Sequence, residues 1–196
     1  MTSQRVLLVI PPLTQLNTPY PSITYLTGFL QSRNVHVEQA DLGIEMVLRL
    51  FSADGLRSVF KQLHNNTDSL PKEALQMIKA EHHYLEMIGP VISFLQGHSP
   101  DLAARLVQSG VLPQGPRFRG RLKFARSVSL ADRAKQWATF FLEDLADLVQ
   151  ATITPHFGLS RYAEHIGRSA SSFDQIVGAL TEPRTLIDEC LLEARH

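Results

Sequence analysis

The feature that most constrains the fold is a short apolar run near the start of the chain. Residues 6–10 read Val-Leu-Leu-Val-Ile and are followed directly by Pro11 and Pro12. A continuous run of branched apolar residues that ends at prolines is typical of a strand buried on both faces, as in a parallel sheet. We therefore expect residues 5–10 to form a central strand.

The residues that follow predict a βαβ unit. Prolines and polar residues between 13 and 21 exclude regular structure there, and Ser22 is then a candidate N-cap for a helix over residues 22–33. Asn34 is expected to end this helix in the left-handed conformation, after which residues 35–40 form a second strand that leads to Asp41. A strand, a helix and a strand in this order predict two parallel strands.

From residue 44 onward the pattern is helical. We expect a break or a kink at Gly89–Pro90 and a loop over residues 111–128, which is rich in proline, glycine and arginine. The predicted helices cover residues 44–52, 54–64, 72–88, 90–97, 100–110, 129–151, 159–167, 172–180 and 183–195. The predicted fold is an α/β start of the Rossmann-like βαβ type over residues 1–43, followed by a mostly α-helical region over 44–196, so the chain is predominantly helical overall.

The predicted sheet has too few strands to stand alone. A two-stranded parallel sheet is not independently stable, and both strands look too apolar to face water. Two alternatives remain open: the helices cover the pair completely, or further strands lie in sequence beyond His196.

Charge and cysteine content narrow the function classes. The 19 basic and 19 acidic side chains cancel, which disfavours a protein built wholly around polyanion binding. No run approaches the roughly 18 apolar residues of a membrane span, so we expect a cytoplasmic protein without a membrane partner. The single cysteine, Cys190, excludes an internal disulfide and any site that needs two thiolates from one chain, and we expect it to lie in the core.

The carboxyl ends of the two strands are the predicted place for a ligand. The loop Pro11–Pro21 and Asp41 fall there, but the loop contains no glycine, which disfavours a nicotinamide or flavin dinucleotide. Alternatively, the prolines only end the strand and Asp41 caps the helix that starts near Gly43. The residues expected nearest any ligand are Leu13, Thr14, Tyr20, Ser22 and Asp41.

Two other clusters of side chains are candidate sites. His82 and Glu86 lie one helical turn apart, but a catalytic zinc ion needs three protein ligands, so we predict no metal site. Five basic residues from Arg117 to Arg126, interleaved with two phenylalanines, resemble a nucleic-acid patch, yet the neutral net charge favours a solvated surface or an interdomain strip of salt bridges. No catalytic residue is predicted.

The opening of the chain resembles the start of the radical S-adenosylmethionine enzymes that carry an N-terminal cobalamin-binding-type domain. The resemblance rests on Val-Leu-Leu-Val-Ile-Pro-Pro, on the helix that begins Tyr20-Pro21-Ser22-Ile-Thr-Tyr-Leu, and on Asp41-Leu42 after the second strand. In that family the first strand commonly ends in P-P, a proline precedes the helix, and the second strand ends near Asp-Leu. The later stretches Ser160–Ala163 and Ser172–Asp174 are also similar to a helical insertion in one branch of the family.

Two departures limit what the resemblance implies. The family holds a [4Fe-4S] cluster with C-x3-C-x2-C, which one cysteine cannot supply. Base-off cobalamin binding uses D-x-H-x-x-G, and none of the eight histidines has an aspartate two residues before it. The resemblance therefore implies that residues 1–43 are part of an incomplete cobalamin-binding-like domain, with cobalamin as a candidate ligand. It also implies that the cluster and S-adenosylmethionine are bound only by a downstream part of a longer parent protein.

Two functions from different classes follow as expectations. The first is the N-terminal cofactor- or substrate-positioning region of such a radical S-adenosylmethionine protein, not catalytic alone, whose partner is the downstream domain. The second is a stand-alone helical protein-interaction module, for which a homo-oligomer is left open.

Overall fold

The computed structural model of the chain describes residues 5–12, 16, 21–67, 70–119, 128–155, 157–159 and 172–193. The chain divides into two compact units, one formed by Met1–Val47 with Leu159–His196 and the other by Leu48–Gly158. The C-terminal segment thus groups with the N-terminal βαβ residues, whereas the sequence-based division placed all of 44–196 in one helical region.

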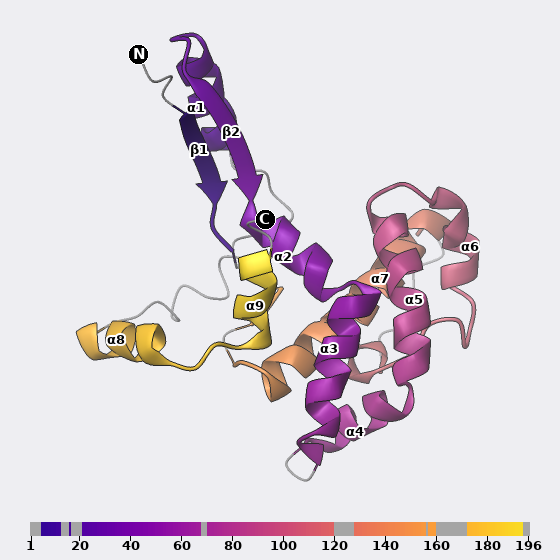
Figure 1. Cartoon of the computed structure of the whole chain (residues 1–196). Helices are drawn as coiled ribbons and strands as arrows, with labels where there is room; N and C mark the ends of the chain where they lie inside the picture. The colour runs from indigo at the N-terminus through magenta and orange to yellow at the C-terminus, as the bar shows by residue number, and fades with distance from the viewer. Residues whose placement is uncertain are drawn as a thin grey trace. The chain divides into compact units, whose positions relative to one another are not determined.

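The βαβ unit forms where the sequence places it. Strand β1 (Arg5–Ile10), helix α1 (Pro21–Gln31) and strand β2 (His36–Asp41) follow one another, and the two strands run parallel in a register that pairs Arg5 with His36 and Ile10 with Asp41 (Figure 1). Asn34 has φ 59°, the left-handed conformation expected after α1. Together with the helical remainder, these elements confirm the predicted fold class.

The prediction that the strands are buried on both faces is wrong. Along β1, half-buried and exposed residues alternate, and Leu7 and Val9 are 58% and 44% exposed. Gln39 of β2 donates a hydrogen bond to Thr27 of α1, so α1 covers one face of the sheet. The reason for the difference is that the described sheet has two strands and one crossover helix, which can cover only one face.

The other face of the sheet is polar at the amino ends of its strands. Arg5 donates a hydrogen bond to Glu38 over 2.6 Å, and His36 lies 3.1 Å from the same carboxylate oxygen. The hydrogen bond from Arg5 is the main reason that the pKa of Glu38 lies below its ordinary value. This face therefore changes from charged residues at one end to apolar residues at the other.

The ends of the first helices differ in part from the prediction. Helix α1 begins at Pro21, so Ser22 lies inside the first turn and is not the N-cap; proline is well suited to the first helical position because it needs no N–H partner. Asp41 does cap the next helix, α2 (Leu42–Leu50), because its Oδ1 accepts a hydrogen bond from the backbone N–H of Ile44 over 3.0 Å.

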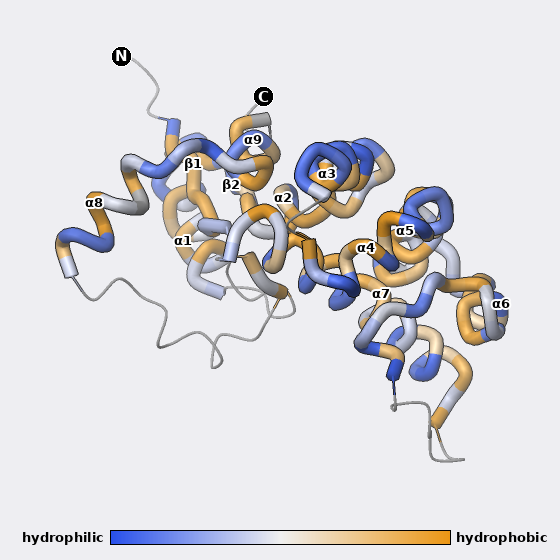
Figure 2. The backbone as a smooth tube through the Cα atoms, turned by 90° about the horizontal axis from the view of Figure 1, so that it is seen from below, coloured by the Kyte–Doolittle hydropathy of each residue, from blue (hydrophilic) through white to orange (hydrophobic). Residues whose placement is uncertain are grey.

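The second unit is a helical assembly around an aromatic core. It contains α3 (Ala53–His64), α4 (Lys72–Lys79), α5 (Glu81–Leu95), the short helices η2 (Pro100–Leu102), α6 (Ala103–Leu106) and η3 (Pro116–Phe118), and α7 (Leu130–Thr152). Helix α3 buries one apolar side, formed by Leu56, Val59, Phe60 and Leu63, and hydrophobic and hydrophilic positions alternate along its tube in Figure 2. The apolar stripe of α7 is buried, and it consists of Trp137, Phe141, Leu145 and Leu148.

Helix boundaries in this unit correct two predictions. Of the break or kink expected at Gly89–Pro90, the break is wrong, because α5 runs through Pro90 and the interruption falls at Ala80 instead. An interior proline costs about 3 kcal/mol, but α5 buries one continuous side from Tyr84 to Phe94 that favours an unbroken helix. The helix expected over 100–110 is shorter and ends at Leu106.

The remaining elements lie at the C-terminal end. Helices α8 (Phe173–Thr181) and α9 (Leu186–Glu193) match the predicted helices at 172–180 and 183–195 in position, and Cys190 is buried, as expected. The helix predicted over 159–167, with the similar stretch Ser160–Ala163, lies outside the described residues. In the described part of the chain, no helix combines the length and apolar character needed to cross a bilayer.

Two helical glycines in the second unit predict opposite effects of the same substitution. A Cβ at Gly55 would overlap the backbone oxygens of Arg49 and Leu50, whereas a Cβ at Gly89 would meet nothing within 4 Å. We expect Gly55→Ala to destabilise the unit by about 1–3 kcal/mol, and Gly89→Ala to stabilise it by about 0.5–1 kcal/mol, because glycine is unfavourable inside a helix. Urea unfolding followed by the fluorescence of Trp137, the only tryptophan, measures both. Equal effects of the two substitutions would contradict the close packing at Gly55.

Candidate functional site

The predicted ligand site at the carboxyl ends of the strands is only partly described. Ser22 is exposed in the first turn of α1, and Asp41 is half-buried at the end of β2. Leu13, Thr14 and Tyr20 lie outside the described residues. The alternative role considered for Asp41, capping the next helix, is confirmed by its hydrogen bond from Ile44, and its role toward a ligand stays a prediction.

An open cavity of about 530 Å³ lies at this end of the βαβ unit. Its volume is within the usual range of small-molecule sites, roughly 300–1,000 Å³. One side of the cavity is the face of the sheet that α1 leaves uncovered, and it continues past the ends of both strands. The residues on this side are Leu7, Val9, Pro12, Ala40 and Leu42.

Helix α9 and the segment before it form the other side of the cavity. Leu191 and Leu192 add to the apolar lining, and Arg184 and Asp188 are the charged residues on it. Asp188 Oδ2 accepts hydrogen bonds from the backbone N–H and the hydroxyl of Thr185, at 2.7 and 2.8 Å. This is the arrangement of a helix N-cap, which fixes Asp188 on the first turn of α9.

Sequence reasoning missed this cavity for an identifiable reason. The pattern Thr185-x-x-Asp188 is a readable helix start, but it carries no information about which strand the helix packs against. Arg184 and Val9 are far apart in the chain, and only the folded βαβ unit shows that one cavity contains both.

The histidines do not assemble a metal site in the described residues. His64 lies 2.8 Å from Glu81, and the ring of His83 is 2.8 Å from the backbone oxygen of Val111. Within the described part of the chain, no group of three or more His, Cys, Asp or Glu side chains is placed to hold a metal ion.

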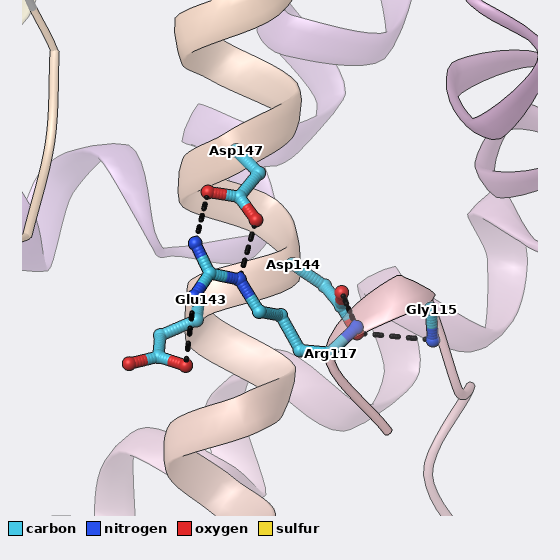
Figure 3. Close-up of polar contacts among 5 residues, drawn as sticks. All are labelled: Gly115, Arg117, Glu143, Asp144 and Asp147. Carbon is cyan, nitrogen blue, oxygen red and sulfur yellow. Dashed lines mark hydrogen bonds and ion pairs between the residues drawn. The ribbon is translucent and has the colours of Figure 1, made fainter. Parts of the chain in front are cut away.

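The described part of the basic segment forms salt bridges, but they lie within the second unit and not between domains as one of the two alternatives expects. Arg117 donates two hydrogen bonds to Asp147, at 2.6 and 2.7 Å, and lies 3.7 Å from Glu143, both on α7 (Figure 3). Arg119 donates to Gln76 over 3.3 Å. The other three basic residues of the segment lie outside the described residues: Arg121, Lys123 and Arg126.

Asp144 is the one buried charged side chain among the described residues, and it has a perturbed pKa. Burial raises the pKa of Asp144 to about 6, and hydrogen bonds from the backbone N–H groups of Arg117 and Gly115 lower it in part. These bonds are 2.8 and 3.0 Å long, and each uses a different carboxylate oxygen (Figure 3).

The surroundings of Asp144 indicate a structural role. A Cβ at Gly115 would lie 2.5 Å from the carboxyl group, so the loop approaches α7 closely at a glycine. Next to this contact, Phe118 packs edge-on against Trp137 and Phe140. A perturbed carboxyl group in a cleft is a candidate catalytic group, but both oxygens of Asp144 are used to hold the loop, so we interpret it as an anchor.

The buried carboxyl predicts a pH-dependent stability for the second unit. The folded-state pKa of about 6 lies above the ordinary value of 3.8. Between these values the folded state keeps a proton that the unfolded state releases, so stability falls as the pH rises from about 4 to 6, by at most about 3 kcal/mol. We expect Asp144→Asn to remove this component, measured as the difference in urea midpoint between the two proteins at pH 4.5 and pH 7 by Trp137 fluorescence. Parallel pH profiles of the two proteins would contradict it.

Comparisons with known proteins do not assign this chain to a family. No protein-family model, curated protein or solved structure matches the chain. A functional proposal must therefore depend on the βαβ unit, its cavity and the sequence resemblance of the same residues.

Proposed function

We propose that this chain is the N-terminal cofactor- or substrate-positioning region of a radical S-adenosylmethionine iron–sulfur protein with a cobalamin-binding-type domain, and that it is not catalytic alone. The observation that carries the proposal is the parallel β1–α1–β2 unit with a cavity at the carboxyl ends of its strands. It forms over the same residues whose sequence resembles the start of that family. Ligands of open α/β sheets bind at this end of the strands.

The unfinished sheet supports a larger parent domain. Among the described residues, β1 and β2 pair only with each other, so each strand has one edge without a hydrogen-bonding neighbour. Unpaired edges attract further strands, and sheets of this class normally contain several more. We infer that the parent protein supplies the missing strands and the second cover of the sheet.

The cysteine content indicates which part of the parent protein would bind the iron–sulfur cluster. With Cys190 as the single cysteine, the chain cannot hold a [4Fe-4S] cluster, which needs three or four thiolates. The cluster and S-adenosylmethionine would therefore belong to the downstream part of the parent. In this chain the rigid strand ends would position a substrate or cofactor, with Ser22, Asp41 and the cavity as the described contacts.

Cobalamin held through a histidine does not fit the described residues. The D-x-H-x-x-G motif is absent, and His36, the histidine of the sheet, lies at the amino end of β2 beside Arg5. The carboxyl end of the sheet has no described histidine. The proposal therefore includes cobalamin only in a form in which no histidine of this chain coordinates the cobalt.

The proposal predicts what the gene encodes after this chain. We expect the reading frame to continue past the codon of His196 and to encode C-x3-C-x2-C, because the reaction of the family requires three cluster cysteines in one polypeptide. Sequencing the transcript provides the measurement. A stop codon after His196, together with a stable purified protein, would overturn the proposal in favour of the second candidate.

That second candidate, a protein-interaction module, is favoured by one observation. Helix α8 exposes four apolar side chains at helical spacing, and the exposed fractions of two of them are 76% for Phe173 and 80% for Leu180. Exposed apolar patches of this kind commonly mark contact surfaces. The four residues are Phe173, Ile176, Val177 and Leu180.

The second candidate predicts self-association through α8. If a second copy covers this surface, the mass from light scattering should rise with concentration, and Phe173→Ser with Leu180→Ser should return it to that of a monomer. Leu95→Ser is the matched control, since Leu95 is 38% exposed in the other unit. A monomer at every concentration would exclude the homo-oligomer.

A further inference from the structure

The cavity beside β1 and α9 has a chemical character that goes beyond its position. Its uncharged lining is entirely aliphatic, from leucine, valine, alanine and proline side chains. An aromatic or polar ring would find no stacking partner and few hydrogen bonds there. A linear aliphatic group suits this lining, because its burial depends only on apolar area.

The two charged residues of the cavity, Arg184 and Asp188, differ in their hydrogen bonding. Asp188 accepts two hydrogen bonds from Thr185 and lies on the first turn of α9. The partial positive charge at this end of the helix stabilises its negative carboxylate. Arg184 is exposed and, within the described residues, makes no hydrogen bond or ion pair. An arginine at the edge of an apolar cavity suits a carboxylate, which it can bind with two parallel hydrogen bonds.

We propose that this cavity binds a linear aliphatic monocarboxylate, whose hydrocarbon chain lies against Leu7, Val9 and Leu191 and whose carboxylate pairs with Arg184. The complementarity has two parts: the hydrocarbon chain matches the apolar sheet face, and the carboxylate charge matches the guanidinium of Arg184. The inference rests on the cavity and not on the proposed parent protein, since neither the cluster nor S-adenosylmethionine takes part in it.

The test uses decanoate and its neutral analogue decanol as probes of the full chain. Isothermal titration calorimetry should give decanoate a dissociation constant about tenfold lower than that of decanol, the usual value of one charge-assisted pair. Amide shifts in a nitrogen-15 NMR titration should be centred on residues of β1, β2 and α9. Equal affinity of the two probes, or shifts centred on α8 or on the outer face of α1, would overturn the proposal.

Two variants separate charge recognition from apolar fit. Arg184→Gln should abolish the preference for decanoate and leave decanol binding unchanged. The control is Arg33→Gln, because Arg33 is an exposed arginine of the same unit that lies over the Phe29 ring. This control should change the affinity for neither probe. Ala40→Phe should weaken both probes because it fills the floor of the cavity. Circular dichroism checks that each variant folds. A decanoate preference that survives Arg184→Gln would show that the carboxylate binds elsewhere.

Discussion

The parallel pairing of β1 with β2 is the constraint on which the first unit depends. Parallel neighbours cannot be joined by a tight turn, so the chain must cross over, and the crossover helix α1 covers one face of the sheet. The same pairing brings Ile10 and Asp41 to one edge and points both strands toward the cavity. The side of the cavity that the strands form follows from that geometry.

The second unit depends on a different interaction, a buried carboxylate between a loop and a helix. Asp144 lies on the buried side of α7 among large apolar side chains, and it accepts hydrogen bonds from the backbone N–H groups of Gly115 and Arg117. Charged Asp144 costs desolvation, but it fixes the segment that carries Phe118 into the aromatic cluster. The helical region therefore combines an apolar core with polar contacts between the loop and α7, which Asp144 makes to the loop backbone and Arg117 makes to Asp147.

Much of the fold could be predicted because local patterns determine it. The β1–α1–β2 order, the left-handed Asn34 and the start of α7 after Ser129 each depend on a few neighbouring residues, and each lies where the sequence predicts it. The helix through Pro90 could not be predicted, since its stability comes from long-range burial that a proline signal does not show. For the same reason the cavity and the contact of Asp144 with Gly115 were missed, because each joins residues distant in sequence.

The two ends of the sheet face that α1 leaves uncovered differ in polarity. Its amino end carries the Arg5–Glu38 pair and His36, and its carboxyl end carries Val9 and Ala40. A segment laid along this face in one orientation would match charge with charge and apolar surface with apolar surface. In the reverse orientation it would bury ionised groups against hydrocarbon, which costs several kcal/mol per charge. The strand pair thus discriminates between the two polarities of a covering element before any specific side-chain contact is formed.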